Sequence, residues 1–136
     1  MGNPIADHMV RQKVRSAHRL PVLRGVRIQI LLETSTTHGG SLSVDPVATM
    51  RSCVPMAALY VWTDRSAPFV AGRVHAKLAV ADATAAFLTS ANLTGHALEK
   101  NMEAGVILQG GRVPQNLRDH LQALVDMKII RKVGAP

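Results

Sequence analysis

Aromatic residues and cysteine are scarce in this sequence of 136 residues. The aromatic residues make up 3% of the chain and are Tyr60, Trp62, Phe69 and Phe87. So few aromatic side chains argue against a nucleic-acid binder that holds the successive bases of a single strand by stacking. Cys53 has no second cysteine with which to form an internal disulfide, so the composition fits a reducing compartment.

Long apolar segments are missing as well. The apolar stretches, such as residues 26–32, are far shorter than the ~20 residues that a membrane-spanning helix needs. Residues 1–7 have neither a basic start nor a long apolar run, so they do not resemble a signal peptide. We therefore expect a cytoplasmic protein that does not associate with a membrane.

Acidic residues are few relative to basic ones. Nine Asp and Glu residues stand against 16 Lys and Arg residues, which gives a formal net charge of +7. The excess is +4 in residues 1–33 and +3 in residues 112–136, whereas residues 34–111 are neutral. A basic excess favours a polyanionic partner and says nothing about the fold. That partner would be nucleic acid or an anionic membrane surface, and we expect it to be nucleic acid, most often DNA, attracted by the two flanks.

The length and the 47% content of hydrophobic residues fit one globular domain. Residues 1–24 are expected to form a basic helical segment, in which a helix runs from Ile5 to about Leu20 and is ended by Pro21. Residues 25–136 are expected to form an α/β domain with a mixed β-sheet flanked by helices. The strands are predicted at residues 25–33, 57–62, 74–81, 85–90 and 104–108, and the helices at residues 45–53, 94–100 and 114–127.

Two pairs of polar residues occupy alternate positions on neighbouring predicted strands. Alternation along a strand places His75 and Lys77 on one face, with their Cα atoms ~7 Å apart. Ser90 and Asn92 repeat this spacing on the next strand of a predicted hairpin, so all four side chains are expected to face one pocket. Because an imidazole and an ammonium group on one face can share a phosphate, this pocket is predicted to bind one.

Two acidic residues accompany these pairs. Asp82 is out of phase with His75, so we expect it in the turn beyond the strand, where a carboxylate can accept backbone hydrogen bonds. Glu103 precedes the last predicted strand, where a buried carboxylate is able to bind one imidazole nitrogen and leave the other free. The alternatives are a polar strand face without chemistry and, for Glu103, an ordinary surface acid.

The spacing of these residues resembles the HxKxxxxD…GSxN signature of the phospholipase D superfamily. It reads His75-x-Lys77, four residues, Asp82, six residues and Thr89-Ser90-x-Asn92. Residues 73–103 are most similar to the phospholipase D-like protein of bacterial DISARM anti-phage systems. The resemblance implies a phospholipase D-like half with α/β/α layers and a single HKD motif. It also implies phosphodiester chemistry that needs neither a metal ion nor another cofactor.

The resemblance also implies a role for each motif residue. His75 would be the nucleophile that forms a phosphohistidine. The other roles would be phosphate binding by Lys77, Ser90 and Asn92, support of the motif by Asp82, and orientation of His75 by Glu103.

Two departures from the family pattern affect this interpretation. Thr89 replaces the usual glycine before the motif serine, which would narrow the approach of the backbone to phosphate. Superfamily active sites are usually built from two motifs, but this chain has one. We therefore expect either a homodimer or a second HKD half supplied by another chain. The elements that usually precede residue 25 are largely missing, which suggests an N-terminally truncated form.

The leading hypothesis is a phosphodiesterase that acts as a nuclease or processes nucleic acid in anti-phage defence, together with other subunits of the defence system. A non-catalytic nucleic-acid-binding or assembly subunit is the first alternative, and an inactive fragment with an intact site is related to it. A phospholipid hydrolase or phosphatidyl transferase is a further alternative, because the motif does not distinguish lipid phosphate from DNA phosphate. A serine hydrolase built on Ser90, His75 and Asp82 is disfavoured, because the G-x-S-x-G turn is missing.

Overall fold

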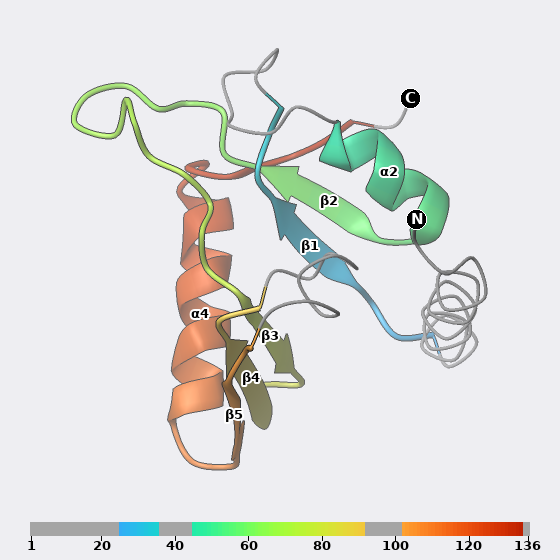
Figure 1. Cartoon of the computed structure of the whole chain (residues 1–136), viewed down its shortest axis with the longest axis vertical. Coiled ribbons are helices and arrows are strands. Elements are labelled where there is room, and N and C mark those ends of the chain that lie inside the picture. The colour runs from blue at the N-terminus through green and yellow to red at the C-terminus, as the bar shows by residue number, and fades with distance from the viewer. Residues whose placement is uncertain (1–24, 36–44, 92–101, 135–136) are drawn as a thin grey trace. The chain divides into compact units, whose positions relative to one another are not determined.

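The computed structural model describes residues 25–35, 45–91 and 102–134 (Figure 1). The predicted basic segment 1–24, the predicted helical turns at 94–100 and the motif residue Asn92 lie outside the described residues. The chain divides into two compact units, of which the first comprises residues 1–74 and 131–136 and the second residues 75–130. The domain boundary expected after residue 24 stays a prediction.

The first unit contains a mixed sheet of three strands. They are β1 (Gln29–Leu32), β2 (Ala58–Val61) and β6 (Arg131–Lys132), in the order β1-β2-β6. β1 runs parallel to β2, and β6 runs antiparallel to it. Leu59 and Tyr60 of β2 are buried, as expected for the central strand of a sheet. The predicted strand 57–62 is thus confirmed. The predicted strand 25–33 is confirmed only in part, because β1 begins at Gln29, and the short β6 was not predicted.

The helix α2 (Pro46–Cys53) follows β1 in the chain and precedes β2, as a connection between parallel strands requires. Its start was predicted from Asp45 and Pro46. Oδ1 of Asp45 accepts hydrogen bonds from the Val47 N–H at 2.9 Å and the Ala48 N–H at 3.4 Å, and Pro46 takes the first helical position. The predicted helix 45–53 is therefore confirmed.

The second unit contains an antiparallel sheet of three strands in the order β3-β4-β5. The strands are β3 (Leu78–Ala81), β4 (Ala85–Thr89) and β5 (Gly105–Gln109). The predicted hairpin joins β3 to β4, and its turn places Asp82 and Ala83 at positive φ angles of 50° and 56°. Leu78 lies opposite Leu88, which in turn lies opposite Val106, so the three strands present their apolar side chains in one row.

The helix α4 (Val113–Asp126) packs against all three strands of this second sheet (Figure 1). Its leucines recur every three or four residues and are half-buried, which confirms the predicted closing helix. Ala86 of β4 is buried. The mixed α/β fold class is confirmed, with the described strands divided between two sheets. None of the helices in the described ranges is long and apolar enough to cross a membrane.

Candidate active site

His75 and Lys77 precede β3 and do not lie on it. The predicted strand 74–81 is therefore too long, because β3 begins at Leu78. The last hydrogen bond between β3 and β4 runs from the Thr89 N–H to the Lys77 carbonyl oxygen at 3.0 Å. The segment that carries both candidate catalytic side chains thus lies outside the sheet.

Two side chains end the ladder at this point. In a regular antiparallel ladder the next bond would join the Ala91 N–H to the His75 carbonyl oxygen. Instead, the Ala91 N–H donates to Oγ1 of Thr89 at 3.1 Å, and the His75 carbonyl accepts from Nζ of Lys77 at 2.9 Å. Such local bonds compete with a ladder for the same backbone groups. In the sequence, Thr89 stands out only because it replaces the usual glycine of the motif. Nothing in the sequence predicts that its hydroxyl accepts the Ala91 N–H.

The structure brings the side chains of His75 and Lys77 together. Nζ of Lys77 lies 3.2 Å from Nε2 and 3.4 Å from Nδ1 of His75. An ammonium group only donates hydrogen bonds, so the ring nitrogen that receives one must be unprotonated. His75 is exposed and Lys77 is half-buried. The pair therefore presents an imidazole and an amine together at the surface.

Ser90 and Glu103 form a second pair. Oγ of Ser90 donates to Oε2 of Glu103 at 2.5 Å and accepts from the Ala104 N–H at 3.1 Å. The Ser90 N–H donates to the Ala104 carbonyl oxygen at 2.9 Å, which extends the pairing of β4 with β5 by one residue. Because a hydroxyl group has one hydrogen, Ser90 has none to donate to a phosphate while it binds Glu103.

Thr89 links the backbone around the two pairs. Its N–H binds the Lys77 carbonyl, and its hydroxyl donates to the Ala104 carbonyl oxygen at 3.2 Å. The His75–Lys77 pair and the Ser90–Glu103 pair thus belong to the same end of the second sheet.

Asp82 lies in the turn between β3 and β4, where the sequence placed it, and its side chain is exposed. The length of β3 separates this turn from Lys77, roughly 15 Å along the strand at ~3.3 Å per residue. Asp82 therefore lies apart from both pairs. Within residues 25–35, 45–91 and 102–134, no group of three or more His, Cys, Asp or Glu side chains is arranged to hold a metal ion.

The segment before His75 is bound by a buried carboxylate. Oε1 of Glu33 forms an ion pair with Nη2 of Arg65 at 2.7 Å, and Oε2 accepts the Val74 N–H at 2.5 Å. Burial alone would raise the pKa of the Glu33 carboxyl. The hydrogen bond from Arg65, the backbone hydrogen bonds from Val74 and Thr34, and the charge of Arg65 lower this pKa by more, so it lies below its usual value. In the sequence Glu33 is only the end of a strand, and nothing local indicates its partners.

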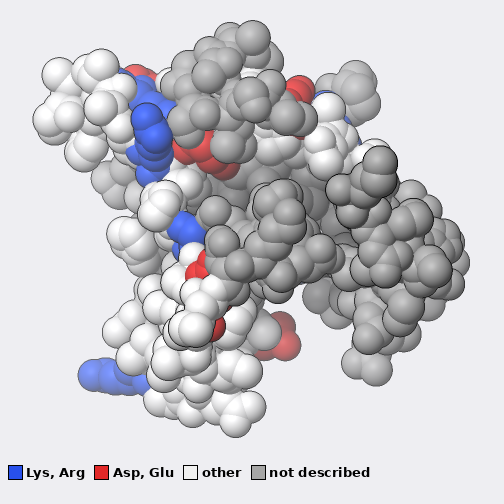
Figure 2. Space-filling model, viewed as in Figure 1, with Lys and Arg blue, Asp and Glu red and all other residues white. Residues whose placement is uncertain are grey.

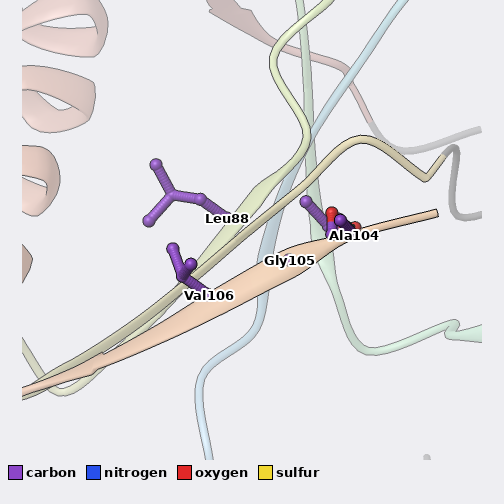
Figure 3. Close-up of a pocket in the computed structure, with 5 residues that line it drawn as sticks. Leu88, Ala104, Gly105 and Val106 are labelled. Atoms are coloured by element: carbon purple, nitrogen blue, oxygen red, sulfur yellow. Dashed lines mark hydrogen bonds between the residues drawn. The ribbon is translucent and has the colours of Figure 1, made fainter.

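An open hollow of about 330 Å³ lies at the end of β4 and β5. It is lined by Leu88, Thr89, Ala104, Gly105 and Val106, and Figure 3 shows Leu88 and Val106 projecting to the same side of the strands. None of these residues is titratable, so the hollow contributes no acid, base or ionised group to the candidate site.

On the face shown in Figure 2, the described basic and acidic side chains lie interspersed.

Comparison with known proteins gives two findings. Residues 7–125 match the protein family described as "Cardiolipin synthase, PLD-like domain". The structure is similar to NucT from Helicobacter pylori, with a TM-score of 0.65 and 19% sequence identity over 92% of this chain and 75% of that chain. At this level of identity the similarity shows a shared fold. No curated protein matches the sequence.

Proposed function

Because this chain belongs to the phospholipase D-like domain family, we propose that it is a phosphodiesterase with His75 as its nucleophile. The observation that carries this proposal is the contact between Nζ of Lys77 and the imidazole nitrogens of His75, at 3.2 and 3.4 Å. A neutral imidazole supplies the attacking lone pair. The adjacent ammonium stabilises the negative charge of the phosphate oxygens as the reaction proceeds.

In the proposed reaction, an unprotonated ring nitrogen of His75 attacks phosphorus and forms a P–N bond, while the bond from phosphorus to the leaving oxygen breaks. The leaving oxygen takes a proton from an acid, for which we propose the imidazolium of the same motif in a second copy of the chain. Water then attacks the phosphohistidine and breaks the P–N bond. The second imidazole accepts the proton of that water, which restores both groups.

The remaining motif residues are proposed to assist this reaction. Lys77 and Asn92 bind the non-bridging oxygens, and Asp82 supports the motif from the turn. Glu103 is proposed to orient His75, and Ser90 to help bind the phosphate. Their hydrogen bond of 2.5 Å would couple these two roles, because a phosphate that captures the Ser90 hydroxyl frees a Glu103 oxygen.

We propose DNA as the substrate and anti-phage defence as the setting, with a homodimer or a second HKD half completing the site. The formal charge of +7 supports a polyanionic substrate. The similarity of residues 73–103 to DISARM proteins belongs to the same proposal. Further subunits of the defence system are the partners that it implies.

The test is cleavage of single- and double-stranded DNA in EDTA by the wild type, His75→Ala, Lys77→Gln and the control His120→Ala. His120 is exposed on α4 and belongs to neither pair. We expect His75→Ala to lose at least about 100-fold in kcat, and Lys77→Gln to lose about 100-fold, while the control is unchanged. No cleavage by the wild type, or equal cleavage by His75→Ala, would refute the proposal.

Two other functions give different results in the same assays. A non-catalytic nucleic-acid-binding subunit would show salt-dependent DNA binding that persists in His75→Ala, without turnover. The description of the matching family as cardiolipin synthase favours a phosphatidyl transferase or phospholipid hydrolase as the second candidate. That candidate predicts turnover of phosphatidylglycerol vesicles in EDTA and no cleavage of DNA.

A further inference from the structure

We propose that Glu33 and Arg65 are positioning residues that hold the chain in place immediately before His75. We call the Glu33 carboxylate, the Arg65 guanidinium and the Val74 N–H the Glu33 clamp. None of these groups belongs to the motif, and the clamp acts through the backbone. Its kinetic consequence depends on the phosphodiesterase function proposed above, whereas its effect on the backbone does not.

The Glu33 carboxylate uses its two oxygens for two different partners. Oε1 binds Nη2 of Arg65 at 2.7 Å, and Oε2 accepts the Val74 N–H at 2.5 Å. A glutamine at this position has one acceptor oxygen and one amide donor group, so it can satisfy only one of the two donors. The clamp therefore requires a carboxylate.

Both side chains of the ion pair are shielded from water. The Arg65 side chain is 8% exposed and that of Glu33 is 10% exposed. A buried pair is held in one geometry only when further hydrogen bonds satisfy its remaining polar groups. Nε of Arg65 supplies one such bond, to the Trp62 carbonyl oxygen at 3.1 Å.

The loop from β2 to Val74 is packed around the same arginine. The Arg65 guanidinium carbon lies 5.2 Å from the centroid of the Trp62 ring. The rings of Phe69 and Trp62 pack edge-to-face, with their centroids 5.9 Å apart. A Cβ atom at Gly72 would lie 2.5 Å from Cη2 of Trp62, so only glycine allows the backbone to pass this close. The Gly72 N–H also donates to the Phe69 carbonyl oxygen at 2.8 Å. These contacts fix the path of the chain up to the clamp.

The backbone on either side of His75 is thus bonded, at Val74 within the first unit and at Lys77 within the second. The Val74 N–H is held by Glu33, and the Lys77 carbonyl is held by the Thr89 N–H at 3.0 Å. Between these bonds the backbone is outside the sheet, so the ladder of β3 does not fix the imidazole. Since a displacement of about 1 Å can cost a reacting group 100-fold in rate, two anchors around a nucleophile have a direct kinetic effect.

The test compares the wild type with Glu33→Gln, Glu33→Asp and the matched control Asp119→Asn. Asp119 pairs with Arg118 on the surface of α4, so its substitution removes an exposed carboxylate of similar chemistry. The first readout is the hydrogen-exchange rate of the Val74 amide. We expect it to rise about 10-fold in Glu33→Gln, to recover in part in Glu33→Asp, and to stay unchanged in Asp119→Asn. The amides of β2 serve as internal references for global opening.

The second readout is DNA cleavage at a temperature where every variant is folded by circular dichroism. We expect kcat of Glu33→Gln to fall about 10-fold with KM within about twofold, because the nucleophile is displaced and the substrate contacts remain. A fall in kcat that only follows the folded fraction would overturn the proposal. So would faster Val74 exchange with unchanged kcat, or a Val74 amide that already exchanges freely in the wild type.

Failure of the proposed function is distinguishable from failure of the clamp. A wild type without activity in EDTA refutes the function, and the Val74 exchange rate then still decides whether Glu33 holds the backbone. Should Glu33→Gln fail to fold, Glu33→Asp provides the same two readouts. It keeps the charge but is one methylene shorter, so intermediate exchange and intermediate kcat support the clamp, and wild-type values of both overturn it.

Discussion

Glu33 and Arg65 in the first unit form a buried ion pair, whereas Arg118 and Asp119 in the second unit form an exposed one. The side chains of the first pair are 8% and 10% exposed, and those of the second are 54% and 53% exposed. Their shortest distances, 2.7 and 2.6 Å, are nearly equal. The N–O distance therefore does not distinguish the two ion pairs, whereas the exposure of their side chains to solvent does.

The difference shows two uses of charge in one chain. Inside the first unit, each oxygen of Glu33 has its own donor, so the carboxylate acts as a rigid part of the scaffold. On the second unit, the Arg118–Asp119 pair and the His75 side chain remain open to solvent. A side chain proposed to react with a phosphate has to be accessible, whereas a side chain proposed to position it works better when water is excluded.

Arg65→Ala tests this comparison with the largest expected effect. It leaves the Glu33 carboxylate buried without its counter-ion, which we expect to lower the free energy of unfolding by about 3–5 kcal/mol. Arg118→Ala removes the same side chain from an exposed pair and is expected to cost no more than about 1 kcal/mol. Urea unfolding of both variants, followed by circular dichroism, measures the contrast. Equal losses in the two variants would contradict it.

The elements foreseen from the sequence are those with local signals. Asp45 and Pro46 mark the start of α2 within two residues, and the three residues between Ala81 and Ala85 are enough to indicate the hairpin. The start of β3 was misplaced because it depends on where Thr89 and Lys77 direct their side chains, and a strand pattern does not report that. The short β6 was not predicted, because it is defined by its pairing with β2, and the paired residues lie about seventy positions apart in the sequence.

The candidate site was foreseen to a similar extent. The spacing of His75 and Lys77 brings their side chains together, whether or not a sheet holds them. The bond from Ser90 to Glu103 depends on the register between β4 and β5, so the sequence assigned these residues two independent roles. Glu33 contacts Arg65 across 32 positions, and no local pattern in the sequence predicts this contact.

Gly105→Ala probes the second unit at a crowded position of β5. A Cβ atom at Gly105 would lie 2.9 Å from the Leu88 carbonyl oxygen and 2.9 Å from Cε2 of Phe87. The half-exposed Phe87 ring can move, but the Leu88 carbonyl belongs to the sheet, so we expect a loss of about 1–3 kcal/mol in urea unfolding. Gly134→Ala, in the first unit, has no atom within 4 Å of the added carbon and is expected to be neutral.

The smallest expected effect is the pH dependence that Glu33 contributes. Because its pKa is lowered in the folded protein, the folded state binds this proton less readily than the unfolded state. Stabilisation by Glu33 is then fully present above the unfolded pKa, near 4.5, and is lost as the pH falls through the folded pKa. Acidification from about pH 7 to about pH 3.5 should therefore destabilise the wild type more than Glu33→Gln, which does not titrate.

The measurement is the free energy of unfolding in urea at several pH values for the wild type, Glu33→Gln and Arg65→Gln. Taking the difference between wild type and Glu33→Gln cancels the contributions of the other carboxylates, provided that they do not contact Glu33. In Arg65→Gln the guanidinium no longer lowers the pKa of Glu33, while burial still raises it, so the acid-dependent loss should shrink toward that of Glu33→Gln. If all three proteins lose the same free energy of unfolding on acidification, the pKa of Glu33 is not lowered by the folded structure. The buried pair would then contribute no more to stability than the exposed pair on α4.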